Sequence, residues 1–369
     1  MTLVALMNLL IERNFNVLFN FRYAVQVNFR MLFRMKMKVQ QVINCKFTNW
    51  YPCFKDITIK SIAIKLPESV CEYLLSDGMV LPDEKDPQRG DNTSDSATAS
   101  DEDIWESESD RSSVAPPRFP DFEEEVIRCI QALGGSVFPK LDWSSPKDAA
   151  WISFDRTLRC HCIQDIFLLL KSSDFVTHDL TVPFEHCSTV TDSSSQSVIH
   201  HLVLRQWQHI SAEGEFRCFV QNNVVVAISQ RHLGIHFPHL VVHEKAICSD
   251  ILHFYHTCIG NKFPDTDFTF DIWRKSGEDI VLLDFNPFGP VTDSLLFSWN
   301  ELMNWSPRNP SCPCEFRCVL EKDIKPDPYR WYAMPQDFVH LSTGEDPAKL
   351  IDLLNVKIQD VGDEESDSN

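Results

Sequence analysis

The feature that most limits how this chain can fold is residues 268–287, where apolar and oxygen-bearing side chains alternate on both sides of Gly277-Glu278. Glycine in the first place of a two-residue turn is typical of a type II′ β-hairpin, and such a turn puts Asp271 directly opposite Asp284. Because side chains alternate along a strand, Asn286 points to the same side as Asp284. The sequence therefore predicts three oxygen-bearing groups on one face of a hairpin. Its other face is apolar and carries Phe270, Ile272, Leu283 and Phe285.

Two carboxylates that lie opposite each other repel unless a positive charge neutralises them. Mg²⁺ accepts carboxylate and amide oxygens as ligands, with water or phosphate oxygens completing its coordination shell. The sequence therefore predicts a Mg²⁺ site formed by Asp271, Asp284 and Asn286. The alternative is a solvent-facing acidic hairpin whose carboxylates never meet.

Arginines near a neighbouring predicted hairpin are placed to meet phosphate groups. Glu215 and Arg217 share one face of its first strand, and Arg231 follows its second strand. A guanidinium offers two parallel donors to phosphate oxygens. The alternative is that each arginine is half of a surface ion pair.

A lysine and a polar loop make a second candidate for phosphate contact. Lys140 ends a predicted strand, and the loop of residues 141–148 follows at once. Its hydroxyls, its backbone N–H groups and Lys147 are all possible phosphate donors. The alternative is a lysine that only solvates the end of an edge strand.

Hydrophobic periodicity predicts helices and mainly antiparallel strands in mixed order, which favours an α+β fold over a doubly wound parallel sheet. The predicted strands are 57–66, 136–140, 150–154, 198–207, 215–220 and 224–229, besides the hairpin at 268–287. The predicted helices are 68–75, one capped by Asp121 that ends at Gly134, 163–171, and 241–259, which ends at Gly260.

Net charge limits the classes of partner. The chain of 369 residues has 34 basic and 53 acidic residues, a net charge of −19, which disfavours binding of nucleic acid over a broad surface. No P-loop or G-x-G-x-x-G motif occurs, so a nucleotide site would need another architecture. No apolar run near the N-terminus approaches the length of a membrane-spanning helix.

The cysteines indicate reduced thiols. Their number, 13, is odd, which favours a cytoplasmic protein over a secreted disulfide framework. The two C-x-C pairs, Cys160/Cys162 and Cys312/Cys314, have no matching second half-site for zinc. We interpret them as packing residues.

Composition divides the chain into five parts. Residues 1–34 carry one acid against four arginines and are predicted to be a mis-assigned start or, alternatively, an organellar transit peptide. Residues 35–86 are predicted to form a small α/β unit of a first lobe, and 87–118 an acidic flexible insertion. Residues 119–357 are the predicted main body with a C-terminal docking helix, and 358–369 are an acidic tail.

Several long segments resemble one known family. They read VFPKLDWSSPKD at 137–148, IFLLLKSSDF at 166–175, LVLRQW at 202–207, EFRCFV at 215–220 and LDFNPFG at 283–289. These segments closely resemble the cell division cycle protein 123 family, and the resemblance covers about residues 42–356. It implies an ATP-grasp fold, in which two lobes with largely antiparallel sheets enclose a nucleotide cleft.

The same resemblance implies roles for individual residues in binding ATP and Mg²⁺. The residues that would line the phosphate side are Lys140, Trp143, Ser145, Lys147 and Asp148. Those that would form the hinge beside the adenine are Arg205, Gln206 and Trp207. Glu215 would meet the ribose or base, Arg217 and Arg231 the phosphates, and Asp271, Asp284 and Asn286 the Mg²⁺. The chain departs from the family pattern at Ser145 and Lys147, where alanine and arginine are commoner, and at Gln206, where lysine is usual.

The resemblance also implies a function. The family's members are assembly factors that bind the gamma subunit of eukaryotic translation initiation factor 2, so that the alpha and beta subunits can join it. We therefore expect a monomeric cytoplasmic chaperone that uses Mg-ATP. One alternative is an ATP-grasp ligase that activates a carboxylate as an acyl phosphate, and another is a scaffold whose nucleotide cleft is vestigial.

Overall fold

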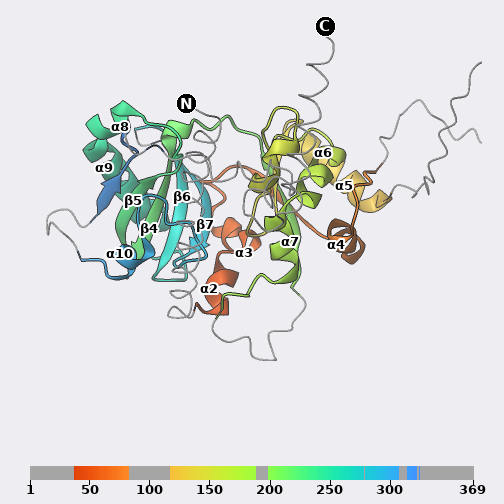
Figure 1. The fold of residues 1–369 in the computed structure, drawn as a ribbon, viewed down its shortest axis with the longest axis horizontal. Helices are drawn as coiled ribbons and strands as arrows, with labels where there is room; N and C mark the ends of the chain where they lie inside the picture. Colours follow the sequence, from red (N-terminus) through yellow and green to blue (C-terminus); the bar gives the residue numbers. More distant parts are fainter. Residues whose placement is uncertain are drawn as a thin grey trace, which may run out of the picture. The chain divides into compact units, whose positions relative to one another are not determined.

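The structure is a computed structural model that describes residues 37–82, 117–187, 198–277, 279–306, 314–321 and 324 (Figure 1). Within these ranges, no helix has the length and apolar character that crossing a membrane requires. The predictions for the N-terminal extension, the C-terminal docking helix, the acidic tail and nearly all of the acidic insertion fall outside the described residues.

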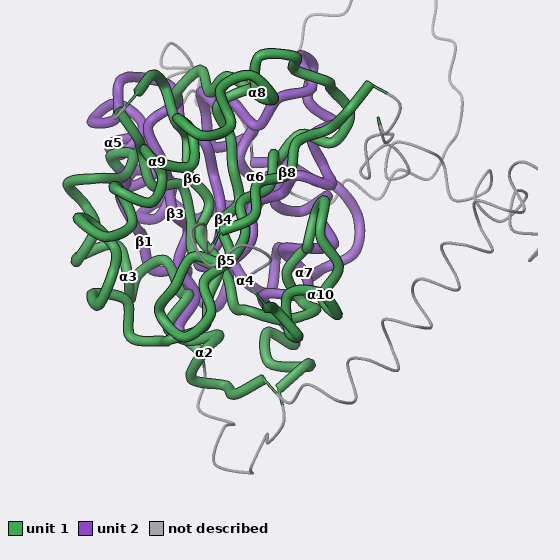
Figure 2. Tube along the Cα trace, turned by 90° about the vertical axis from the view of Figure 1, so that its left-hand side faces the viewer, with its two compact units in different colours: residues 1–60, 182–198, 208–369 green, residues 61–181, 199–207 purple. Residues whose placement is uncertain are grey.

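The chain forms two compact units (Figure 2). Unit 1 contains residues 1–60, 182–198 and 208–369, and unit 2 contains residues 61–181 and 199–207. Both combine helices with antiparallel strands, and unit 1 adds one parallel strand, so the predicted α+β class is confirmed.

Unit 2 is built on a three-stranded antiparallel sheet with the order β1-β3-β2. Its strands are β1 (Ser61–Lys65), β2 (Val137–Lys140) and β3 (His201–Gln206). Its helices are α4 (Glu68–Leu75), α5 (Pro120–Ala132), the 3₁₀ helix η1 (Lys147–Ile152), α6 (Ile163–Lys171) and α7 (Asp174–Thr181). The helices pack with one face of the sheet in a single apolar core, in which Leu133, Ile166 and Phe167 are almost fully buried.

Unit 1 is built on a five-stranded sheet with the order β7-β6-β4-β5-β8. The antiparallel strands are β4 (Glu215–Gln221), β5 (Val224–Gln230), β6 (Phe268–Ser276) and β7 (Asp279–Pro287), and β8 (Glu315–Arg317) lies parallel to β5. The helical elements are α2 (Val39–Asn44), α3 (Phe47–Phe54), the 3₁₀ helix η3 (Ala212–Gly214), α8 (Pro238–Val242), α9 (Glu244–Phe254), the π-helical turn η4 (Tyr255–Ile259) and α10 (Trp299–Met303).

Helices cover the apolar face of the β6–β7 hairpin. The rings of Trp50 and Phe54 in α3 lie 5.3 and 5.0 Å from the ring of Phe285, and Tyr255 stacks on Phe270 at 5.8 Å. The sequence predicts this face to be apolar, and its residues Phe270, Ile272 and Phe285 are buried. A β-bulge between Asp271 and Ile272 shifts the register, so Ile272 pairs with Leu282 and not with the predicted Leu283.

Three further predictions of local structure are wrong in detail. Residues 150–154 are not a strand, because their first half belongs to η1, where Ala149 and Ile152 turn toward the core at the three-residue spacing of a 3₁₀ helix. The helix predicted at 241–259 is divided into α8, α9 and η4, although it ends at Gly260 as predicted.

The third error concerns the start of α5. Phe119, not Asp121, is the N-cap, and Pro120 occupies the first turn, where its missing N–H is harmless. The Glu123 carboxylate accepts the Phe119 N–H at 2.8 Å and so performs the capping role.

The short edge strand β8 is held by an ion-pair network around Arg317. Its guanidinium lies 3.1 Å from a Glu301 carboxylate oxygen and 2.8 Å from one of Glu315, and it covers the ring of Phe297 at 4.1 Å. The hydrogen bond from Arg317 lowers the pKa of Glu301 to about 2, with help from Ser298.

Replacing Glu301 with glutamine should therefore reduce stability in a pH-dependent way. A carboxyl with a depressed folded-state pKa stabilises the fold above its unfolded pKa, and that contribution disappears as the pH falls toward the folded value. The difference from the parent chain should be largest at pH 7 and shrink between about pH 4.5 and 2. It should stay below about 1 kcal/mol, because the Glu301 side chain is 43% exposed.

Urea unfolding at pH 7, 4 and 3 measures this effect. Glu124→Gln is the matched control, since that carboxylate forms a loose exposed pair with Arg128 at 4.0 Å. A Glu301→Gln difference that is the same at all three pH values would contradict the role given to the Arg317 hydrogen bond.

Candidate functional site

The β6–β7 hairpin has the predicted register at its acidic end. Asp271 pairs directly with Asp284, and Thr269 pairs with Asn286. Gly277 has a φ of +48°, the left-handed conformation that favours glycine at the start of a tight turn. Asp271 is buried, whereas Asp284 and Asn286 are half-buried. The predicted opposition of the two acids is therefore confirmed.

The charge that neutralises Asp271 is an arginine of the neighbouring strand. In β4, Arg217 pairs in register with Asp271, and its Nε and Nη2 each donate to one Asp271 carboxylate oxygen at 2.8 Å. Arg217 Nη1 donates to the Asp293 carbonyl at 2.7 Å, and Arg231 Nε lies 3.7 Å from Asp271. Two guanidinium groups therefore surround one buried carboxylate.

The second acid of the pair is less enclosed. Asp284 Oδ1 accepts the N–H of Phe285 at 3.1 Å, and its side chain remains half-buried, as does that of Asn286. A carboxylate and an amide on one sheet face, accessible from outside the core, form the donor set that a hard divalent cation prefers.

Glu215 and Arg231 extend this group of charges. Glu215 lies two residues before Arg217 and so on the same face of β4, and its carboxylate is 2.8 Å from Nε2 of His232. The Arg231 N–H donates to the Glu215 carbonyl at 3.1 Å. Unit 1 thus gathers six of the predicted residues near one sheet face: Glu215, Arg217, Arg231, Asp271, Asp284 and Asn286.

Apolar packing continues on the same sheet face beside these charges. Phe219 lies two residues after Arg217, and its ring is 5.8 Å from Phe297 and 5.9 Å from Trp299. Trp299 Nε1 donates to the carbonyl of Thr292 at 2.7 Å. The Arg217–Asp271 pair itself is buried, with side chains 5% and 6% exposed, and a charge pair out of water attracts more strongly than an exposed one.

Unit 2 carries the other predicted residues. Lys140 and Arg205 lie on the same face of the three-stranded sheet, opposite the face that holds the apolar core. Lys140 is 1% exposed and Arg205 is 6% exposed. Gln206 and Trp207 follow directly, and the Trp207 N–H donates to the Ser136 carbonyl at 3.1 Å.

Two buried carboxylates anchor the loop that follows Lys140. Asp142 lies 3.1 Å from the N–H and 3.0 Å from Nδ1 of His201, and Asp179 accepts the Ser144 N–H at 2.7 Å and its hydroxyl at 3.0 Å. The loop is therefore fixed at both its second and fourth residues. Its predicted phosphate-side residues Trp143, Ser145 and Lys147 are half-buried.

The Asp148 carboxylate accepts hydrogen bonds from the residues at the start of α7. It accepts the Ser173 hydroxyl at 2.6 Å and the N–H groups of Asp174 and Phe175 at 2.7 and 3.3 Å. Burial raises the pKa of Asp148, and these hydrogen bonds oppose that rise. Any contribution of Asp148 to a ligand would therefore come through the position of this loop.

Sequence reasoning missed Asp142, Asp179 and His201. Asp142 lies within the phosphate-side loop, so its place beside Lys140 offered a signal. Asp179 lies in α7, which was not predicted, and no local pattern connects it with Ser144.

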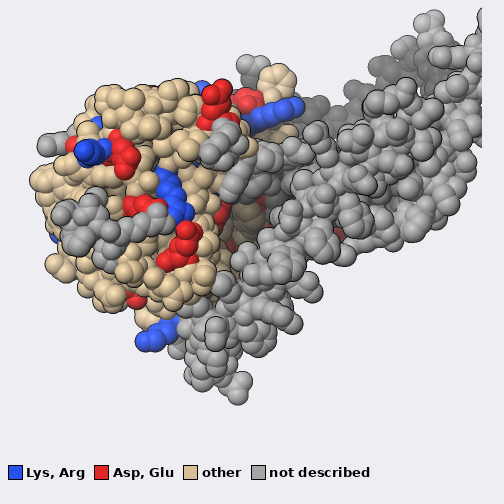
Figure 3. Space-filling view, turned by 60° about the vertical axis from the view of Figure 1, so that its left-hand side comes forward, with Lys and Arg blue, Asp and Glu red and all other residues tan. Residues whose placement is uncertain are grey.

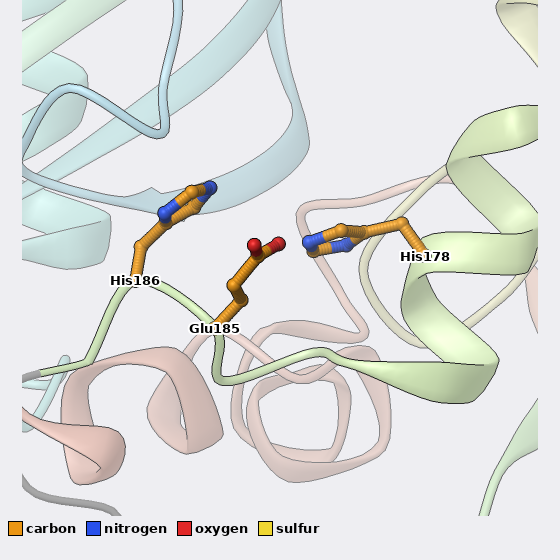
Figure 4. Close-up of side chains that lie close together, drawn as sticks. All are labelled: His178, Glu185 and His186. Carbon is orange, nitrogen blue, oxygen red and sulfur yellow. The ribbon is translucent and has the colours of Figure 1, made fainter. Parts of the chain in front are cut away.

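Three further side chains of types that can ligate metals lie outside the predicted site. Figure 4 shows His178 on α7 and Glu185 and His186 on the segment after it. His178 belongs to unit 2 and the other two to unit 1, so we assign them no common site.

The face shown in Figure 3 carries few charged side chains among the described residues. Lysine and arginine lie there among aspartate and glutamate, without a continuous basic patch on that face. The exclusion of nucleic acid stays a prediction from net charge.

The comparison with protein families gives a match over most of the chain. The model of the D123 family matches residues 50–342. The chain belongs to the D123 family. A Xenopus tropicalis protein named translation initiation factor eIF2 assembly protein is 44% identical over 338 residues, which are 90% of this D123 chain and all of that protein. A Dictyostelium discoideum protein of the same name is 32% identical, with 86% of this chain and 96% of that protein covered.

A solved structure supports the fold of this D123 chain. The structure of Cdc123 from Schizosaccharomyces pombe is 32% identical and has a TM-score of 0.62, with 78% of this chain and 100% of that chain covered. The mixed α+β architecture is therefore shared with a solved structure.

Proposed function

We propose that this D123 protein takes part in the assembly of eukaryotic translation initiation factor 2 (eIF2). The observation that carries the proposal is the 44% identity to an eIF2 assembly protein whose whole length is covered. We further propose that the partner is the gamma subunit and that the protein works as a monomer in the cytoplasm, where its 13 cysteines would stay reduced.

The proposed cofactors are ATP and Mg²⁺, bound in the manner of ATP-grasp proteins. In support, Asp284 and Asn286 offer half-buried oxygens on the face that also carries Arg217 and Arg231. These residues fit Mg²⁺ and phosphate oxygens, and Mg²⁺ would neutralise phosphate charge. The phosphate-side loop from Lys140 to Lys147 would supply further donors.

The ion pair of Arg217 and Asp271 connects the proposed binding of nucleotide with that of Mg²⁺. Arg217 uses one acceptor site on each Asp271 oxygen, so a phosphate that drew Arg217 away would leave both oxygens free to ligate Mg²⁺. The Arg217 guanidinium balances the charge of the Asp271 carboxylate in this pair. Nucleotide and metal should therefore bind together more strongly than either binds alone.

Binding to separately purified eIF2 subunits tests the proposed function. The immobilised chain should retain the gamma subunit but neither alpha nor beta alone, and alpha should join gamma in its presence. Retention should be compared with Mg-ATP, with ATP plus a chelator and without nucleotide. A chain that retains none of the three subunits under any of these conditions would contradict the proposal.

A further inference from the structure

The end of η1 and the turn after it expose two large aromatic side chains. Phe154 has a relative exposure of 107%, and Trp151 three residues earlier has 45%. A fully exposed phenylalanine ring leaves apolar surface in water, and covering that surface would favour association with a partner. Ala149 is fully buried and Ile152 packs on the core of unit 2, so the turn is anchored beside the two exposed rings.

Hydrogen bonds hold this turn in one conformation. The Ser153 hydroxyl lies 2.9 Å from the Ala150 carbonyl and 2.7 Å from that of Thr157. Asp155 accepts the Thr157 N–H at 2.9 Å and the Thr157 hydroxyl at 2.8 Å, and these bonds lower the pKa of Asp155. Arg156 adopts a left-handed φ of +55°, which is uncommon for a side chain of this kind. Phe154 is therefore presented on a preorganised turn, which reduces the entropy lost on binding.

The charges around the turn differ in sign from the rest of the chain. Residues 147–159 carry the exposed cations Arg156 and Arg159 and the half-buried Lys147 against one exposed acid, Asp155, in a chain with a net charge of −19. A partner surface with acidic groups around an apolar pocket would complement this local charge. Three cations are too few to hold a nucleic acid backbone against the overall negative charge.

We propose that Phe154, flanked by Trp151, is a docking residue that inserts into an apolar pocket with an acidic rim on the gamma subunit of eIF2. This inference rests on the proposed function and names the part of the chain that contacts the partner. Aromatic residues are enriched at the buried centres of protein interfaces, where a few of them dominate affinity. Phe154 is fully exposed on a hydrogen-bonded turn, so it could serve as such an aromatic interface residue.

The test measures binding of the purified gamma subunit to the full chain and to two serine variants. Phe154→Ser should weaken binding at least about tenfold. Val242→Ser is the matched control, because Val242 is 77% exposed on α8 of the other unit, and it should change affinity less than about twofold. Both changes are on the surface, so thermal unfolding should be unaltered in each variant.

A photoreactive benzoylphenylalanine at position 154 gives a second readout. It should cross-link to the gamma subunit, whereas the same group at position 242 should not. Equal affinity of Phe154→Ser and the parent chain would overturn the inference but leave the proposed function intact. Cross-linking from position 154 only to a second copy, to the chain's own residues or to RNA would also overturn it. A parent chain that fails to bind the gamma subunit would overturn both.

Discussion

Replacing Arg217 with methionine should lower the free energy of unfolding by about 3 kcal/mol. The side chains of Arg217 and Asp271 are only 5% and 6% exposed, and their two hydrogen bonds are both 2.8 Å long. Methionine fills similar space but leaves the Asp271 carboxylate buried without its bidentate partner. Arg231, at 3.7 Å, compensates in part, which places the loss near the lower end of values for broken buried pairs.

Urea unfolding of matched variants measures this loss. Arg274→Met is the control, because Arg274 lies in β6 and forms an ion pair of similar length, 2.7 Å, with Asp250, but both side chains are about one-fifth exposed. Its loss should be about 1 kcal/mol. Adding Asp271→Asn to Arg217→Met should recover part of the stability, since it removes the unpaired charge. A loss below 1 kcal/mol for Arg217→Met would contradict the importance of the pair.

The sequence predicts the hairpin and its acid pair because both depend on local information. A glycine at the turn and alternating side chains determine which residues of adjacent strands face each other. The Asn222-Asn223 hairpin follows the same logic, and both asparagines adopt the positive φ of 51° and 60° that such a turn requires. Hairpins whose turn residues and strand alternation are visible in the sequence could therefore be predicted from it.

The pairing of Arg217 with Asp271 could not be predicted from the sequence, for a physical reason. Arg217 meets Asp271 only because β6 lies beside β4, a neighbour 54 residues away in the chain. The sequence predicted Mg²⁺ as the neutralising charge and assigned Arg217 to a phosphate, so it did not predict the Arg217–Asp271 pair. Sheet order is a tertiary property, and no spacing within the hairpin reports it.

Short elements stabilised by tertiary contacts also escaped prediction. They are α2, α3, α7, α10 and β8, none of them longer than eight residues. Helix α3 contains Pro52 and depends on packing of Trp50 and Phe54 against Phe285. Helix α7 begins where Asp148, 26 residues before Asp174, accepts the N–H groups of Asp174 and Phe175. Helices of this length gain their stability from such contacts and not from local propensity.

Replacing Asp284 with alanine should abolish Mg-dependent ATP binding, with a loss of affinity of at least about 100-fold. Asp284 is the more accessible acid of the hairpin pair, and it and Asn286 carry the half-buried oxygens proposed as Mg²⁺ ligands. The parent chain should lose a similar factor when Mg²⁺ is removed, whereas the variant should no longer respond to Mg²⁺. The variant should lose less stability than Arg217→Met, because Asp284 is only half-buried.

Calorimetric titration with ATP, with and without Mg²⁺, measures these affinities, and Asp279→Ala is the matched control. Asp279 lies in the same strand, but its side chain is 60% exposed and 3.7 Å from Lys275, so its removal should leave ATP binding unchanged. Should Asp284→Ala bind Mg-ATP as tightly as the parent chain, the opposed acids would have no role in holding a metal. Arg217 and Arg231 would then supply the positive charge that the Asp271 carboxylate needs, and the hairpin would be a purely structural part of unit 1.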